Sequence, residues 1–390
     1  MRSGALRVGI VADYREERWP SMDLVAEMLA DHLPTADPGI CPMLLRPSWR
    51  RRATALRAVG QSAGAHAVDR YSNRYGDYAW WLRTRRRDFD VFHVVDHSYA
   101  HLVHVLPPHR TVVTCHDIDA FRCLAGRERP VYRHAARWIL SGLRRAAMVT
   151  CDTRATRDEI VAANLLSADR LVVIHNGVHR ALLEGEEPAA RAEVDRLAGP
   201  VREIELLHVG STIPRKRIDV LLRTIALVRA RRGTVSLLRA GGAMTAEQRR
   251  LAVELGIADA VVELPSLGIR ELAALYRRAV LTLLPSDYEG FGLPVIESLA
   301  SGTPVLASRI PALVEVGGGV AAYAEPGQPA LWAECVERLL HEREVEPGWW
   351  AYRREQGRHH AAAFTWDAYA HEMAGVYRAV AARAGHGVAA

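Results

Sequence analysis

The chain has 390 residues, more than one hydrophobic core usually supports, so we expect two domains. Its contents of 49% hydrophobic and 25% charged residues are ordinary for a soluble globular protein. No apolar run approaches the roughly 18 residues that cross a bilayer, and the first residues lack the pattern of a signal peptide. We therefore expect a cytoplasmic protein without a membrane-spanning helix.

The cysteine pattern agrees with a reducing compartment. The five cysteines are scattered and form no C-x-x-C pair: Cys41, Cys115, Cys123, Cys151 and Cys335. Such spacing argues against a disulfide framework and against a zinc site. We expect reduced structural thiols.

The net charge of +6 comes from the first half of the chain. Residues 1–180 hold 27 of the 51 basic residues but only 19 of the 45 acidic ones, with arginine clusters at 50–52 and 83–87. Two interpretations fit: a solvated face of an arginine-rich protein, or a contact with an anionic acceptor or with the inner face of a membrane. No nucleic-acid partner is expected, because no binding motif or aromatic platform is present.

Short β-branched runs alternate with longer helical patterns along the chain. Each run is apolar and followed by a polar turn, which is typical of buried parallel strands in βα units. The expected strands are Val8–Ala12, Val91–Val95, Thr111–Cys115, Met148–Thr150, Leu171–Ile174, Glu205–Val209, Val235–Arg239, Val261–Glu263, Leu281–Leu284 and Pro304–Ala307. The expected helices include Met22–Leu33, Arg154–Ala163, Val220–Ala230, Glu271–Arg278, Leu331–Glu342 and Trp366–Arg383.

The alternation restarts after residues 184–200, an acidic, alanine-rich stretch with two prolines that we interpret as a linker. The sequence thus predicts two doubly wound α/β domains, at 1–184 and 200–363. A C-terminal helix at 364–390 is expected to pack back on the N-terminal domain. Ligands of such domains bind at the carboxyl ends of the parallel strands.

The most informative segment is PSDYEGFGLPVIESLASGTPVLAS at 285–308. It follows an expected strand, turns through two glycines and enters a helix, whose first backbone amides form an anion site. Glu289 lies in the turn and Glu297 one turn into the helix, and two carboxylates placed in this way suit recognition of sugar hydroxyls. By spacing alone, Glu297 also fits an acid that complements the helix dipole, and Glu289 a solvated loop residue.

Lysine occurs only once in this sequence. Of the 51 basic residues 50 are arginine, and Lys216 lies in the motif IPRKR at 213–217. An ammonium and a guanidinium are not interchangeable beside a phosphate, so this exception points to Lys216 as a functional residue.

Together, these segments resemble the retaining GT-B glycosyltransferases of family 4. That family carries two glutamates separated by seven residues in an EGFGLP-like context, as at Glu289 and Glu297. Other segments match in order and spacing: NGV at 176–178, HVGSTIPRKRIDVLL at 208–222, ELAALYRRAVLTLLPS at 271–286, IPALVEVGGG at 310–319 and TCHDIDAF at 114–121. The resemblance implies a GT-B fold of two Rossmann-like domains that face each other across a cleft.

The resemblance also implies roles on the donor side. Glu297 is expected to hold the ribose hydroxyls, Glu289 the hydroxyls of the transferred sugar, and Lys216 the diphosphate. Relatives often carry an arginine directly after the glycine of the phosphate segment, where this chain has Ser211, and Arg215 is expected to assist instead. The donor pocket is completed by Gly290, Phe291, Gly292 and Leu293.

On the N-terminal side, His116 matches a family histidine close to the transferred sugar. Asp13, Arg15 and His97 are expected on the acceptor side. The loop at 13–21 lacks the glycine pair of many relatives, so analogy gives little about the acceptor, which is a glycan, a lipid-linked molecule or a small molecule.

The expected activity is transfer of a hexose, mannose or glucose, from a UDP- or GDP-sugar with retention of configuration. No carboxylate is placed as a nucleophile, so we expect front-face displacement without an essential metal or other cofactor. Two alternatives remain: a nucleotide-sugar-binding protein without catalysis, and a GT-B epimerase or phosphorylase.

Three further patterns have simpler explanations. Asp117 and Asp119 form a D-x-D pair, the metal signature of the GT-A fold, but they follow a strand in a Rossmann context. The histidines at 93, 97, 101 and 104 are favoured as partly buried polar residues, since zinc would need a further ligand and a second shell. Trp80 and Trp81 are expected to be buried on a helix rather than inserted in a membrane.

Overall fold

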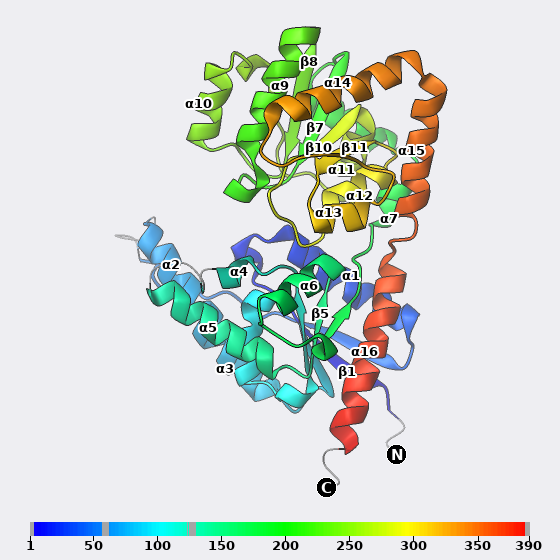
Figure 1. The fold of residues 1–390 in the computed structure, drawn as a ribbon. Helices are drawn as coiled ribbons and strands as arrows, with labels where there is room; N and C mark the ends of the chain where they lie inside the picture. Colours follow the sequence, from blue (N-terminus) through cyan, green and yellow to red (C-terminus); the bar gives the residue numbers. More distant parts are fainter. Residues whose placement is uncertain (1–3, 57–61, 123, 125–129, 387–390) are drawn as a thin grey trace. The chain divides into compact units, whose positions relative to one another are not determined.

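The computed structural model describes residues 4–56, 62–122, 124 and 130–386. The chain forms two compact units (Figure 1). The first unit comprises Met1–Asn176 with Trp366–Ala390, and the second comprises Gly177–Thr365. Each unit is built on a six-stranded parallel sheet flanked by helices, so the predicted two-domain Rossmann-like α/β architecture is confirmed.

The sheet of the first unit has the strand order β2-β1-β3-β4-β5-β6. Its strands are β1 (Leu6–Val11), β2 (Ile40–Leu45), β3 (Val91–Val94), β4 (Thr111–Cys115), β5 (Met148–Cys151) and β6 (Leu171–Val173). All residues of β3, β4 and β5 are buried, which explains why these strands are continuous apolar runs in the sequence. The strand β2 was not predicted, because it lies at the edge of the sheet and contains Pro42.

The helices of the first unit include short 3-10 helices and one π-helical turn, η2. They are η1 (Arg15–Glu17), α1 (Pro20–Ala36), α2 (Ala63–Tyr71), η2 (Ser72–Asp77), α3 (Tyr78–Arg85), η3 (His97–His104), η4 (Pro108–Arg110), α4 (Asp119–Arg122), α5 (Pro130–Arg145), α6 (Arg154–Ala162), η5 (Ala168–Arg170) and α16 (Trp366–His386). The helix α1 begins at Pro20 and buries Leu29 and Leu33 on the side that faces α16. Tyr369 and Tyr377 of α16 complete this core, and Figure 1 shows α16 alongside the first unit.

The sheet of the second unit has the order β12-β11-β10-β7-β8-β9. Its strands are β7 (Ile204–Val209), β8 (Val235–Ala240), β9 (Val261–Glu263), β10 (Leu281–Leu284), β11 (Val305–Ser308) and β12 (Ala322–Ala324). Its helices are α7 (Arg180–Leu183), α8 (Pro188–Ala198), η6 (Pro214–Lys216), α9 (Ile218–Arg232), α10 (Ala246–Glu254), η7 (Ala258–Ala260), α11 (Ile269–Arg278), α12 (Leu293–Ala300), α13 (Pro311–Gly317), α14 (Pro329–Val345) and α15 (Pro347–Ala361). The three-residue edge strand β12 was not predicted.

The expected linker at 184–200 was wrong. Within this stretch, α8 is a helix of the second unit and packs against α11. Its residues Ala190, Val194 and Ala198 recur every four positions and are buried in the core of that unit. Composition alone suggested a linker because acidic residues at 184–187 precede α8 and because most of its buried positions are alanine.

One smaller expectation also needs correction. Trp80 is 65% exposed rather than buried, whereas Trp81 packs partly against the core. Residues His97–His104 form a 3-10 helix. Among the described residues, Cys41, Cys115, Cys151 and Cys335 are free thiols, and Cys123 lies outside them. No helix within the described ranges is long and apolar enough to span a bilayer.

Candidate functional site

The candidate donor site of the second unit lies at the point where the sheet reverses its winding direction. From β7 the chain proceeds to β8 on one side, and from β10 it proceeds to β11 on the other. The loops that leave these two adjacent strands diverge, and this divergence forms the crevice in which doubly wound sheets bind ligands. Lys216 ends η6 after β7, and Glu289 lies in the loop between β10 and α12.

Lys216, Arg215 and Glu289 form a charged cluster at this point. The Lys216 Nζ atom donates to Glu289 Oε1 at 2.5 Å, and Arg215 Nη1 donates to Glu289 Oε2 at 2.8 Å. The Ser286 hydroxyl also donates to Glu289 Oε1 at 2.7 Å. Burial by itself would raise the pKa of Glu289, but Lys216 and Arg215 outweigh it and lower this pKa to about 2. Glu289 is therefore a carboxylate at neutral pH.

The glycine turn that follows Glu289 is fixed by its backbone. Gly292 has a φ angle of +93° and caps α12, and a Cβ atom there would lie 2.3 Å from the Leu313 side chain. The Phe291 ring packs into the core, 6.1 Å from the Phe364 ring centroid, so only its backbone is available to a ligand. Gly290 and Leu293 flank this turn. Leu293 is the first residue of α12, so the backbone N–H groups of the first helical turn start there.

Glu297 is held separately from this cluster. Its Oε2 atom accepts a hydrogen bond of 2.8 Å from the Tyr276 hydroxyl, and burial raises its pKa. Glu297 is the fifth residue of α12, beyond the first turn, so it is not the first-turn acid that spacing alone allowed. Its expected contact with a ribose stays a prediction.

Arg239 was missed by the sequence analysis. Its guanidinium is buried beneath two loops, where Nη1 donates to the Gly242 carbonyl at 2.7 Å and Nη2 to the Gly210 carbonyl at 3.0 Å. These loops touch through their backbones, since a Cβ atom at Gly241 would lie 2.7 Å from the Gly210 oxygen. The only signal was a charged residue near the end of an apolar strand, which is also common where nothing is bound.

The first unit presents a second polar cluster at the equivalent place. Its sheet reverses direction between β1 and β3. Asp13, Asp96, His116 and Asp152 each follow the carboxyl end of a strand, β1, β3, β4 and β5 respectively. All four side chains are buried. Parallel strands thus bring together residues that are far apart in the sequence.

His116 donates hydrogen bonds from both ring nitrogens. Nδ1 lies 2.6 Å from Asp152 Oδ2, and Nε2 lies 2.7 Å from the Val95 carbonyl oxygen, which can only accept. Burial would lower the pKa of His116, but Asp152, together with Asp96, raises it to about 9. The ring is therefore an imidazolium at neutral pH and is not a proton acceptor.

The expected acceptor-side residues are not all brought together. Asp13 is buried beside Asp96, and burial followed by repulsion from Asp96 raises the pKa of Asp13 well above its usual range. His97 is buried as well, with Nδ1 3.4 Å from Asp96 Oδ1. Arg15 instead has an exposed guanidinium that is paired with Glu27 of α1 at 2.8 Å.

Comparison with known proteins identifies the family. The model of Glycosyltransferase Family 4 matches residues 32–182, and the model of Glycosyl transferases group 1 matches residues 203–342. The chain belongs to the group 1 glycosyltransferases of family 4.

Several curated proteins are similar to this group 1 glycosyltransferase. D-inositol 3-phosphate glycosyltransferase of Acidothermus cellulolyticus is 34% identical over 223 residues, which cover 54% of this chain and 48% of that protein. MMP alpha-(1->4)-mannosyltransferase of Mycolicibacterium hassiacum is 32% identical over 236 residues, which cover 59% of this chain and 53% of that protein. The chain thus spans about half the length of the curated relatives it matches.

Solved structures share the fold of this group 1 glycosyltransferase at low identity. Sucrose-phosphate synthase from Thermosynechococcus elongatus superposes with a TM-score of 0.71 at 20% identity, over 97% of this chain and 100% of that one. Anabaena HepE in complex with UDP and glucose gives a TM-score of 0.72 at 14% identity, over 96% of this chain and 100% of that one. These likenesses confirm the GT-B fold.

The remaining polar patterns have protein partners. In the group 1 glycosyltransferase, Asp117 Oδ1 accepts from the Asp119 backbone amide at 2.9 Å, at the start of α4. His93 Nε2 bonds the Thr114 hydroxyl at 2.7 Å, and His101 Nε2 bonds the Arg74 carbonyl at 3.1 Å. Within the described ranges, no three His, Cys, Asp or Glu side chains are grouped to hold a metal ion.

The stability of this group 1 glycosyltransferase is expected to fall as the pH rises through about 9. The folded-state pKa of His116, about 9, lies above the usual value near 6.5, so its stabilising contribution is complete below that usual value and is lost above about 9. The shift corresponds to about 3 kcal/mol of unfolding free energy. Urea titrations between about pH 6 and pH 9 measure it. The Asp152→Asn variant should show a flatter dependence, and equal slopes for the two proteins would contradict this assignment.

Proposed function

We propose that this protein is a retaining hexosyltransferase that moves glucose or mannose from a UDP- or GDP-sugar to a hydroxyl of a glycan, lipid-linked or small-molecule acceptor. The observation that carries the proposal is the cluster of Lys216, Arg215 and Glu289 where β7 and β10 diverge. The activities named for the relatives support it: one relative acts on D-inositol 3-phosphate, another transfers mannose, and HepE binds UDP and glucose.

In this proposal different residues of the cluster bind the diphosphate and the sugar. Lys216 and Arg215 neutralise the diphosphate, on which negative charge grows as the bond to the sugar breaks. Backbone amides at the start of α12 add donors. Glu289 accepts hydrogen bonds from hydroxyls of the transferred sugar, and Glu297 accepts from the ribose while Tyr276 holds its carboxylate in place.

The state of Glu289 supports front-face displacement. Both of its oxygens accept charge-assisted bonds from Lys216 and Arg215, and its pKa of about 2 marks a weak base and a poor nucleophile. The departing phosphate oxygen is therefore proposed to take the proton of the acceptor hydroxyl, which then bonds to the anomeric carbon from the same face. His116 is proposed to act as a buried cation beside the sugar and not as a base, because it is protonated and both of its N–H groups already bond Asp152 and the Val95 carbonyl.

The test is a donor panel. Thermal unfolding is followed with UDP-, GDP-, ADP- and dTDP-sugars, and saturation at about 100 times the dissociation constant should stabilise the protein by about 2.7 kcal/mol. Proton NMR of the product from the best donor then reports the anomeric configuration. Stabilisation by no donor, or an inverted product, contradicts the proposal. Interconversion of the free nucleotide sugar without an acceptor would indicate an epimerase, and dependence on inorganic phosphate would indicate a phosphorylase.

A further inference from the structure

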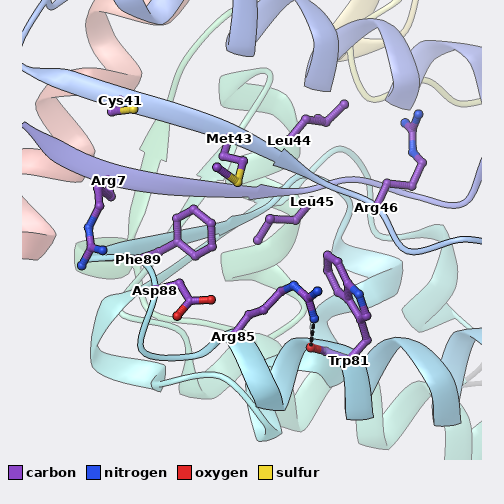
Figure 2. Close-up of a pocket in the computed structure, with 10 residues that line it drawn as sticks. All are labelled: Arg7, Cys41, Met43, Leu44, Leu45, Arg46, Trp81, Arg85, Asp88 and Phe89. Carbon is purple, nitrogen blue, oxygen red and sulfur yellow. Dashed lines mark hydrogen bonds between the residues drawn. The ribbon is translucent and has the colours of Figure 1, made fainter.

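The first unit contains a pocket away from the polar cluster at its strand ends. The pocket has a volume of about 440 Å³ and is bounded by β1, the edge strand β2, α3 and the segment before β3 (Figure 2). That volume lies within the range of small-molecule sites. The pocket extends along β2 from Cys41 to Arg46, and none of its lining residues belongs to the polar cluster.

The floor of the pocket is apolar. Met43 and Leu45 are two residues apart in β2 and therefore lie on the same face, and Phe89 approaches them from the segment before β3 (Figure 2). Leu45 and Phe89 are buried, but Met43 is 55% exposed. The flexible Met43 side chain is exposed to solvent next to buried apolar residues, and this arrangement favours an apolar ligand that would cover it.

The rim of the pocket carries positive charge. It includes three arginines and one carboxylate, that of Asp88. Arg7 is paired with Asp90 at 3.5 Å, and Arg46 is paired with Asp23. Arg85 differs, because no carboxylate in the described part of the chain forms an ion pair with it.

Arg85 is nevertheless held in place. Its guanidinium carbon lies 3.9 Å from the centroid of the Trp81 ring, and Nη1 donates to the Trp81 carbonyl at 3.3 Å (Figure 2). A second donor bond of 3.1 Å reaches the Thr84 hydroxyl. A guanidinium fixed on an aromatic face loses little entropy when it binds an anion, and part of its hydrogen-bonding capacity remains unused.

An added peptide strand fits this edge poorly. The Gly39 and Leu45 carbonyls accept hydrogen bonds from the backbone of Leu6 and Ala12. The backbone groups of odd-numbered residues of β2 therefore point toward β1, and those of even-numbered residues point toward the free edge of the sheet. The central outward position is Pro42, which has no N–H group. The pocket is thus better suited to a small ligand than to β-strand addition.

We propose that this pocket binds a small soluble amphiphilic anion, with a single apolar chain or ring over Met43 and Phe89 and a carboxylate or phosphate on Arg85. The site is independent of the donor site and does not rest on the proposed transferase activity. The ligand contributes what the pocket lacks, which is a cover for the Met43 side chain and a counter-charge for Arg85.

Cys41 gives a site-specific readout, because this exposed free thiol lines the same pocket. The rate of its alkylation is followed by mass spectrometry of the full chain after digestion, with monomeric decanoate, decyl phosphate or decanol added. Decanoate and decyl phosphate should slow the alkylation of Cys41. Decanol should give the same protection only at about tenfold higher concentration, since it lacks the charge-assisted bond.

The variant Arg85→Gln keeps a polar, though shorter, side chain and removes its charge. This substitution should raise the decanoate concentration needed to protect Cys41 by about tenfold or more. The decanol concentration needed should stay unchanged. Arg83→Gln is the matched control, since Arg83 is on the same helix but does not line the pocket. Equal protection by decanol and decanoate, or full protection of Arg85→Gln, overturns the proposal. Protection that depends only on protein concentration would instead show that a second copy covers the pocket and would also overturn it.

Discussion

Replacing Lys216 by alanine is expected to lower the rate of sugar transfer by about 10²–10³-fold. The ammonium group is the closest cation to Glu289 at the point where β7 and β10 diverge, and in the proposed reaction a diphosphate leaving group develops charge there. The loss should appear in kcat and in kcat/KM alike, because the interaction strengthens as the bond to the sugar breaks. Steady-state kinetics with the donor found in the panel measure it.

The neighbouring Arg217 supplies the matched control. Its guanidinium is directed to Asp219 and Asp287, at 2.9 and 3.0 Å, and not to Glu289. Arg217→Gln should therefore keep kcat within a few-fold of the parent protein. Lys216→Arg should not restore activity, since a planar guanidinium cannot replace a compact ammonium at a fixed point. An alanine variant with unchanged kcat would remove Lys216 from the proposed machinery.

Replacing Glu289 by glutamine is expected to lower the free energy of unfolding by about 3–5 kcal/mol in the absence of ligand. The side chains of Glu289 and Lys216 are only 6% and 10% exposed, so the change leaves an ammonium and the Arg215 guanidinium together without a counter-charge. Urea titration at fixed pH and ionic strength measures the effect. If Lys216→Met is introduced as well, the combined loss should be smaller than the sum of the single losses.

Glu297→Gln is the control for this substitution. Glu297 is equally buried, but it faces the neutral Tyr276 hydroxyl, and burial already raises its pKa. A glutamine oxygen can accept the same hydrogen bond, so the expected loss is about 1 kcal/mol or less. Equal losses for the two variants would show that burial alone, and not the pairing with Lys216 and Arg215, governs Glu289.

The central strands and the main motifs could be predicted because their signals are local. Strands such as β4 and β10 are buried throughout and therefore are continuous apolar runs. The edge strand β2 was missed because it contains Pro42. The edge strand β12 was missed because its sequence, AYA, contains no β-branched residue. The helix α8 was mistaken for a linker because its buried face consists of small residues.

The sequence by itself determined the fold class and the residues Lys216, Glu289 and Glu297 as candidates, since residue type, order and spacing are properties of the chain. Only the tertiary structure decided their partners. Lys216 and Glu289 are 73 residues apart and meet because β7 and β10 are neighbours in the sheet. His116 likewise meets Asp152, 36 residues away, across β4 and β5, and becomes a cation that its sequence context does not reveal. A charge state depends on burial and on the nearest opposite charge, and both are set by which strands lie side by side.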